Sequence, residues 1–128
     1  MKDIVLTDRG PKPIGPYSQA VEAGGFIFIS GQLPVDPVTG KMAPADTALQ
    51  TEAVIRNIEA ILKSRGLTLD NVVKTTVFMT DLTQFSAMNE VYAKHFPAPC
   101  PARAAVQVAA LPKGAAVEIE AVAVAGTK

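Results

Sequence analysis

The sequence has few of the residues that build metal centres and covalent cross-links. Among its 128 residues there is one cysteine, Cys100, one histidine, His95, and no tryptophan. A single cysteine excludes an internal disulfide, and a reducing compartment, the cytoplasm, is the expected location. One histidine and one cysteine do not make a structural zinc site, and no carboxylate cluster predicts Mg²⁺ or Ca²⁺. The sequence therefore predicts no metal site.

Excess charge and long apolar runs are also lacking. The 12 basic and 12 acidic residues balance, so overall charge gives no sign of a nucleic-acid or membrane partner. No apolar run approaches the roughly 20 residues of a membrane span, and the first residues lack a signal-peptide layout. Yet 48% of the residues are hydrophobic and 19% are charged. This balance favours one domain over residues 1–128, with apolar surface hidden between subunits.

Hydrophobic periodicity predicts strands and helices in a mixed order. Prolines and glycines interrupt the first forty residues, which allows only short strands and turns there. The clearest strands are expected at residues 25–30, 72–79, 103–109 and 117–124, and the helices at about 46–65 and 81–96. The fold class predicted is α/β (α+β), a mixed β-sheet with two helices packed on one face.

The first predicted helix carries an apolar face and signals at both ends. Its apolar residues at helical spacing are Leu49, Ile55, Ile58, Ile61 and Leu62. Thr47 with Gln50 could form a capping box, and Asp46 is the competing N-cap. Gly66 supplies the C-terminal stop.

One arginine is the most informative residue of the chain. Arg103 lies in a predicted strand that is otherwise alanine and valine. A guanidinium in an apolar setting needs a partner, because an unpaired buried charge costs several kcal/mol. A glutamate of the same chain and a substrate carboxylate are both suitable partners, since the planar guanidinium forms two parallel hydrogen bonds to a carboxylate.

Two glutamates lie in the last predicted strand. Side chains alternate along a strand, so Glu118 and Glu120 point to one side while Val117 and Ile119 point to the other. If the helices cover the apolar side, both glutamates lie on the opposite face. A solvated position is the better interpretation for Glu120.

Other candidate site residues lie in turns and in the second helix. Tyr17, in a Gly-Pro-Tyr turn, offers a ring and a hydroxyl, although by itself the residue is better explained as a packed aromatic at a turn. Gly31 follows Ser30 at the end of a strand, where it marks either a close approach by a ligand or a simple bulge. Asn89 in the second helix is typical of a surface residue.

The motifs converge on one family. They are Gly-Pro-Tyr-Ser-Gln-Ala at 15–20, Ser-Gly-Gln at 30–32, Asn-Glu-Val-Tyr at 89–92 and Pro-Ala-Arg at 101–103 with Val-Glu-Ile at 117–119. Over essentially its whole length the chain resembles the Rid family, reactive intermediate deaminases, also called YjgF or L-PSP endoribonuclease. The resemblance implies a chorismate-mutase-like fold, a homotrimer with clefts between subunits, and no cofactor.

The same resemblance implies an activity and a set of site residues. The activity is hydrolysis of 2-iminobutanoate and 2-iminopropanoate, released by pyridoxal-phosphate enzymes, to 2-oxo acids and ammonia. Arg103 matches the residue that binds the substrate carboxylate, and Glu118 matches the residue that positions the attacking water. The residues matching the cleft lining are Tyr17, Ser30, Gly31 and Asn89. Ala105 replaces a common cysteine, which removes a thiol but leaves a backbone contact to the substrate nitrogen.

Two other functions remain open. An endoribonuclease or translation inhibitor would need a basic groove, which zero net charge does not favour. A non-catalytic protein that binds small carboxylates, or a chaperone, would use Arg103 without turnover. A thiol mechanism through Cys100 and His95 is disfavoured, because a proline-rich turn holds both and offers no orienting group.

Overall fold

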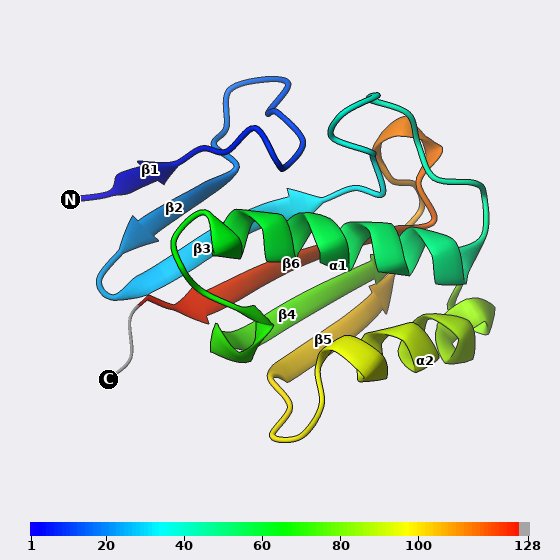
Figure 1. Ribbon diagram of the computed structural model, residues 1–128. Coiled ribbons are helices and arrows are strands. Elements are labelled where there is room, and N and C mark those ends of the chain that lie inside the picture. The colour runs from blue at the N-terminus through cyan, green and yellow to red at the C-terminus, as the bar shows by residue number, and fades with distance from the viewer. Residues whose placement is uncertain (126–128) are drawn as a thin grey trace.

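The computed structural model describes residues 1–125, which form a six-stranded sheet and two helices (Figure 1). The strands are β1 (Asp3–Val5), β2 (Ala20–Ala23), β3 (Phe26–Gln32), β4 (Val72–Met79), β5 (Ala102–Gln107) and β6 (Val117–Val124). The helices are α1 (Thr47–Lys63) and α2 (Phe85–His95). Three short 3₁₀ turns complete the order: η1 (Leu69–Asn71), η2 (Leu82–Gln84) and η3 (Pro112–Gly114).

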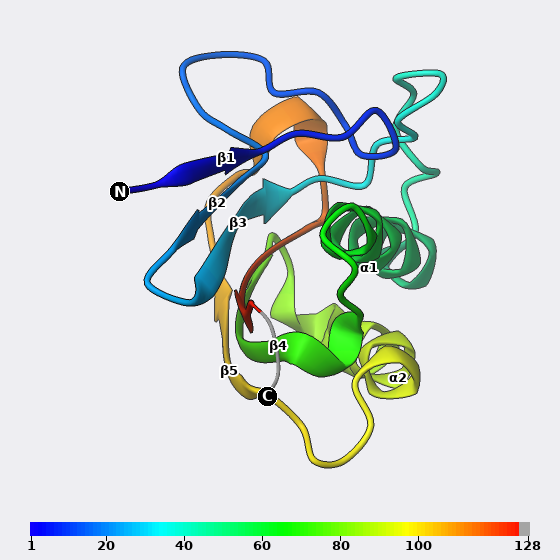
Figure 2. The same cartoon turned by 60° about the vertical axis from the view of Figure 1, so that its left-hand side comes forward.

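The sheet is mixed, and both helices lie on one of its faces. The strand order is β1-β2-β3-β6-β4-β5. Every neighbouring pair is antiparallel except β4 and β5, which run parallel and are joined through α2. Figure 2, turned by 60°, shows α1 and α2 together on one side of the sheet and no element on the other. The predicted fold class, with two helices on one face of a mixed sheet, is confirmed.

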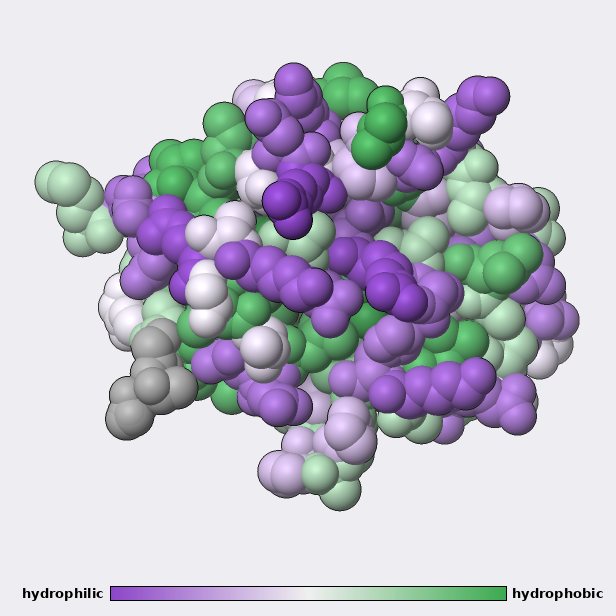
Figure 3. Space-filling model, viewed as in Figure 1, coloured by the Kyte–Doolittle hydropathy of each residue, from purple (hydrophilic) through white to green (hydrophobic). Residues whose placement is uncertain are grey.

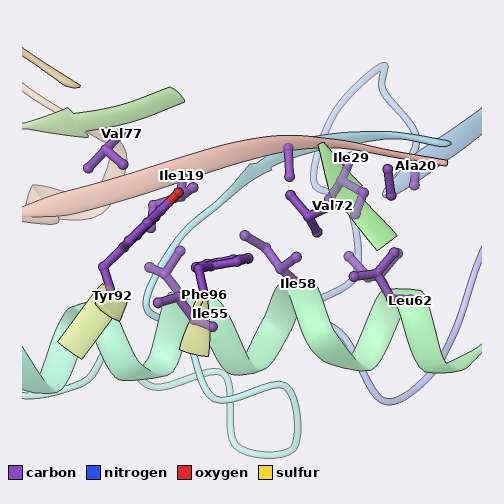
Figure 4. Close-up of a cluster of buried hydrophobic side chains, with 14 of the residues drawn as sticks. Ala20, Ile29, Ile55, Ile58, Leu62, Val72, Val77, Tyr92, Phe96 and Ile119 are labelled. Carbon is purple, nitrogen blue, oxygen red and sulfur yellow. The ribbon is translucent and has the colours of Figure 1, made fainter. Parts of the chain in front are cut away.

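The core lies between the helices and the covered face of the sheet. Ile55, Ile58 and Leu62 of α1 are fully buried and point toward the sheet (Figure 4). They pack with Ile119 of β6 and with the stacked ring of Phe96, which follows α2. Burial of large aliphatic side chains between two layers is the main stabilising term of such a fold.

The first helix departs from its prediction at the N-terminus. Asp46 is the N-cap, and its carboxylate accepts a hydrogen bond from the backbone of Leu49 at 2.9 Å. Gln50 makes no capping box. Its buried amide instead donates to the carbonyl of Ala43 and accepts from the N–H of Ala116, just before β6. Leu49, predicted in the apolar face, is 52% exposed, because it lies two turns before the exposed Arg56 on the same side of α1.

Two further boundaries differ from the prediction by a few residues. The second helix begins with η2, for which Asp81 is the N-cap, and becomes α-helical only at Phe85. Strand β5 ends at Gln107 rather than residue 109, where the parallel pairing with β4 stops.

The two faces of the molecule differ in polarity. Hydrophilic side chains spread over the helical side (Figure 3). The uncovered sheet face carries apolar side chains instead. Its exposed large members are Ile4, Phe26, Phe28 and Val106. Within residues 1–125, no helix is long and apolar enough to span a bilayer.

Candidate active site

A β-bulge in β3 places two consecutive residues on the uncovered face. The pairing of β3 with β6 runs in register through Ile29 and Ala121 and resumes at Gln32 and Ile119. Two residues, Ser30 and Gly31, therefore lie opposite one residue of β6. Without the bulge, residue 31 would pair with Ile119 and point to the core, because faces alternate along a strand.

Gly31 leaves the space that the Glu118 carboxylate occupies. A Cβ atom at position 31 would lie 2.9 Å from Cδ of Glu118 and closer still to its Oε2. Real Cβ atoms do not approach a carboxylate this closely. The sequence left open whether Gly31 marks a simple bulge or a close approach. The structure contains the bulge, and the side chain of Glu118 lies against Gly31.

We expect Gly31→Ala to displace Glu118 while the fold stays intact. The methyl group collides with the carboxylate, and a shift of about 1 Å at a reacting group can cost roughly 100-fold in rate. The backbone at position 31 is not left-handed, so alanine adds no strain there. The rate of a reaction that uses the Glu118 carboxylate should fall about 100-fold, with circular dichroism and the unfolding temperature close to wild type.

A second glycine provides the contrasting control. Gly24, in the turn between β2 and β3, has φ of 60° and open space around it. Gly24→Ala should lower the unfolding temperature, because the left-handed conformation costs a non-glycine residue energy, and should leave the rate of that reaction unchanged. Full activity in Gly31→Ala would show that Glu118 need not occupy its present position.

Glu118 is held in a partly desolvated place. Its strand neighbours Val117 and Ile119 are fully buried on the helical side, and Glu118 points to the uncovered face. Burial raises the pKa of the Glu118 carboxyl, and the charge of Glu120 on the same face raises it further. A raised pKa makes a carboxylate a stronger base, which suits it to accept a proton from water and to return it.

Ser30 and Tyr17 flank this carboxylate with partly used hydrogen-bonding groups. The Ser30 hydroxyl donates to the carbonyl of Ser18 at 2.6 Å, so its oxygen remains an acceptor. The Tyr17 hydroxyl accepts from the N–H of Ile14 at 3.2 Å and keeps its own proton to donate. The Tyr17 ring is exposed, which rules out the alternative of a packed aromatic.

A pocket of about 860 Å³ joins these residues. Its walls come from the loop before β2, the bulge of β3, the loop after β3, η3 and the start of β6. Tyr17, Ser30, Gly31 and Glu118 all line it, and we call these four residues the Glu118 half-site. The described chain thus brings together four of the predicted site residues.

Arg103 lies elsewhere, against α2. Its guanidinium donates to the Asn89 side-chain oxygen at 2.7 Å and lies over the rings of Tyr92 and Phe85, with its Cζ 4.8 Å and 5.3 Å from their centroids. We call Arg103 with Asn89 the Arg103 half-site. The expectation of an apolar setting was wrong, because β5 is an edge strand and the Arg103 side chain is exposed.

The strand register places the two half-sites on opposite faces of the sheet. Arg103 pairs with Thr75, whose hydroxyl is hydrogen-bonded to the buried Tyr92 on the helical side. Glu118 pairs with Phe78, on the uncovered side. Ala105, two residues after Arg103, also faces the helices. Within one chain, Arg103 and Glu118 therefore cannot bind the same small molecule.

The remaining candidates are engaged away from both half-sites. His95 hydrogen-bonds Glu52 of α1 at 2.7 Å, and the Cys100 thiol faces the carbonyl of Phe96. They therefore form no thiol–imidazole pair. Residues 1–125 contain no group of three or more His, Cys, Asp or Glu that could hold a metal ion.

Sequence reasoning missed the aromatic support of Arg103. Phe85, Asn89 and Tyr92 are spaced four and three residues apart, so they share one face of α2. This spacing is a usable sequence signal for a shared face of α2. A guanidinium over aromatic rings is stabilised by cation–π attraction and is held for binding an anion.

The chain resembles known proteins over nearly its whole length. The family model for endoribonuclease L-PSP matches residues 7–125. The 2-iminobutanoate/2-iminopropanoate deaminase of Bos taurus is 49% identical over 126 residues, which cover 98% of this chain and 92% of the bovine protein.

Solved structures share the fold at similar identity. The crystal structure of RidA from the Antarctic bacterium Psychrobacter sp. matches with a TM-score of 0.91 and 47% identity, covering 95% of this chain and 98% of that one. E. coli TdcF, solved with bound serine, matches with a TM-score of 0.89 and 45% identity, covering 97% of this chain and 99% of that one.

Proposed function

This chain belongs to the endoribonuclease L-PSP family, also called the Rid or YjgF family, and on that premise we propose that it hydrolyses 2-imino acids such as 2-iminobutanoate and 2-iminopropanoate. The products are the 2-oxo acid and ammonia. The observation that carries the proposal is the pair of complementary half-sites: an arginine prepared for a carboxylate and a glutamate prepared for proton transfer.

The chemistry needs few groups. Arg103 binds the substrate carboxylate through two parallel hydrogen bonds and fixes the imine carbon in place. Glu118 accepts a proton from a water molecule as the water oxygen bonds to that carbon. The C=N electron pair of the protonated imine moves to its nitrogen, which gives a tetrahedral intermediate with one hydroxyl and one amino group. Glu118 then returns the proton to that nitrogen, the C–N bond breaks as the hydroxyl oxygen forms the C=O bond, and the hydroxyl proton leaves with ammonia as ammonium. The raised pKa of Glu118 supports both transfers.

We propose that the two half-sites meet between copies of the chain in a homotrimer. Arg103 and Glu118 lie on opposite faces of one sheet, so one ligand reaches both only if they come from different copies. The uncovered apolar face and the unpaired outer edge of β5 favour such association. The free backbone groups of Ala105 at that edge are then available to the substrate nitrogen.

Mixing two inactive variants tests this assembly. Arg103→Ala lacks one half-site and Glu118→Ala lacks the other, so neither alone should hydrolyse imine. After co-refolding at equal amounts, any mixed trimer contains one junction with both wild-type residues, and about one quarter of wild-type activity should return. A site built within one chain would recover nothing on mixing.

The relatives support the choice of substrate. The bovine relative is named as a 2-iminobutanoate/2-iminopropanoate deaminase, and E. coli TdcF was solved with bound serine, a small acid whose nitrogen is bonded to the carbon that carries the carboxylate. A coupled assay generates 2-iminobutanoate in situ, traps it with semicarbazide and measures its diversion to 2-oxobutanoate. Binding of 2-oxobutanoate without diversion of the imine would identify a carboxylate-binding protein instead.

A further inference from the structure

Two lysines without an acidic partner face the pocket that contains the Glu118 half-site. Lys12 and Lys113 both line it. Neither ammonium forms an ion pair or a hydrogen bond within residues 1–125. The carboxylates that line the same pocket are those of Asp36, Glu118 and Glu120. Neither lysine forms an ion pair with these carboxylates, so both ammonium groups are available to an anion.

The backbone carries both lysines in fixed positions. The side chain of Gln19, only 1% exposed, donates to the carbonyls of Thr7 and Pro11 at 3.0 and 2.8 Å, and Lys12 is the next residue. Lys113 lies in η3 with φ of 59°, in a turn closed by two backbone hydrogen bonds. The loops that carry them gather at one end of the molecule in both views (Figures 1 and 2). Fixed loops lower the entropic cost of binding a ligand.

The pocket has room for more than a four-carbon acid. Its volume is about 860 Å³, whereas pockets for drug-sized ligands run from about 300 to 1,000 Å³. The Asp36 carboxylate is already used, because it accepts from the N–H groups of Val38 and Thr39. The two lysines are thus the cationic part of a wall that a longer substrate side chain can reach.

We propose that Lys12 and Lys113 bind a second anionic group, carried on the side chain of the substrate. This inference rests on the proposed function, since it takes Arg103 as the ligand of the first carboxylate and Glu118 as the group at the imine carbon. The preferred substrates are then imines of amino acids with an acidic side chain, rather than those with a short apolar one.

The test compares two imines in matched variants. An amino acid oxidase generates the imines of glutamate and alanine in situ, and kcat/KM is measured for each. The variants are Lys12→Gln, Lys113→Gln and the double variant. Lys41→Gln is the control, because Lys41 is an exposed lysine in the loop after β3 that does not line this pocket.

We expect wild type and Lys41→Gln to favour the glutamate imine. In the double variant the ratio of the two kcat/KM values should fall about tenfold, as the loss of two partly solvated charge contacts predicts, while hydrolysis of the alanine imine stays unchanged. A wild type without this preference, or a ratio that survives the double substitution, would overturn the proposal.

A binding measurement separates this inference from the proposed function. The dissociation constants of 2-oxoglutarate and 2-oxobutanoate, the stable 2-oxo acids, are measured by calorimetry for the same variants. If wild type hydrolyses neither imine, the proposed function fails. The lysine assignment is then tested by binding alone: it holds if substitution of the two lysines weakens the binding of 2-oxoglutarate more than that of 2-oxobutanoate, and fails otherwise.

Discussion

Arg103→Ala is expected to lower kcat/KM for 2-iminobutanoate by about 100-fold or more, since hydrogen bonds to a charged group contribute roughly 1.5–3 kcal/mol each. The guanidinium is already oriented by Asn89 and by the rings of Phe85 and Tyr92 before any ligand arrives. Its loss removes the group that fixes the substrate carboxylate. KM should therefore rise and kcat/KM should fall. The coupled semicarbazide assay measures both.

Three controls distinguish carboxylate binding from structural support. Arg103→Lys keeps the charge but loses the planar two-point geometry, so its activity should lie between wild type and alanine. Arg56→Ala removes an exposed arginine paired with Glu52 on α1 and should leave activity unchanged. Light scattering reports the oligomeric state. An Arg103→Ala protein that lost activity only because its assembly changed would contradict our assignment.

Glu118→Gln is expected to reduce kcat by about 100- to 10,000-fold, the usual range for loss of a general base. Glutamine fills the same space beside Gly31 but cannot accept the proton of water. Binding of 2-oxobutanoate should persist, because Arg103 binds the carboxylate. Glu120→Gln, on the same strand face, is the matched control and should remain active. Full turnover in Glu118→Gln would refute the role of the carboxylate.

Burial gives Glu118 a characteristic pH dependence. Its pKa is raised in the folded protein, so kcat/KM should rise with pH through an apparent pKa above the usual carboxylate range. Glu120→Gln removes the neighbouring negative charge, which is the second cause of the raised Glu118 pKa. The rise of kcat/KM with pH should therefore occur at lower pH in this variant.

The stability effect of Glu118 has the opposite sign to the activity effect. A raised folded pKa means that the protonated form stabilises the fold at low pH, and that this contribution is lost as pH rises through the folded pKa. Above the folded pKa the ionised carboxylate is therefore destabilising, and Glu118→Gln should raise the unfolding temperature there. The difference should vanish in acid, where both side chains are neutral. Thermal scans across this pH range would measure it.

Local pattern was sufficient to predict most elements of the fold. Strands β4 and β6 have the predicted bounds, because alternating or β-branched residues define them without outside help. Asp46, the competing N-cap of the prediction, and Gly66 bracket α1, since caps act on the nearest turn. The short β1 was not predicted, because three residues carry no periodic signal and its pairing with β2 alone defines it.

The candidate site was likewise predictable only in part. The residue types and the shared side of Glu118 and Glu120 follow from spacing alone, since a strand has a period of two. The position of Arg103 relative to Glu118 does not follow from spacing in the sequence. It depends on β5 pairing parallel to β4 and β6 pairing antiparallel to it, which are contacts between segments far apart in the chain.

The sequence by itself determined the elements, the chemistry of the key side chains and the resemblance to a family, because each depends on residues close together in the chain or on the identity of single residues. Tertiary structure alone decided which face the helices cover, that the bulge at Ser30 turns Gly31 toward Glu118, and that Arg103 faces away from that carboxylate. These outcomes depend on long-range strand pairing and on burial of the core, which no local pattern encodes.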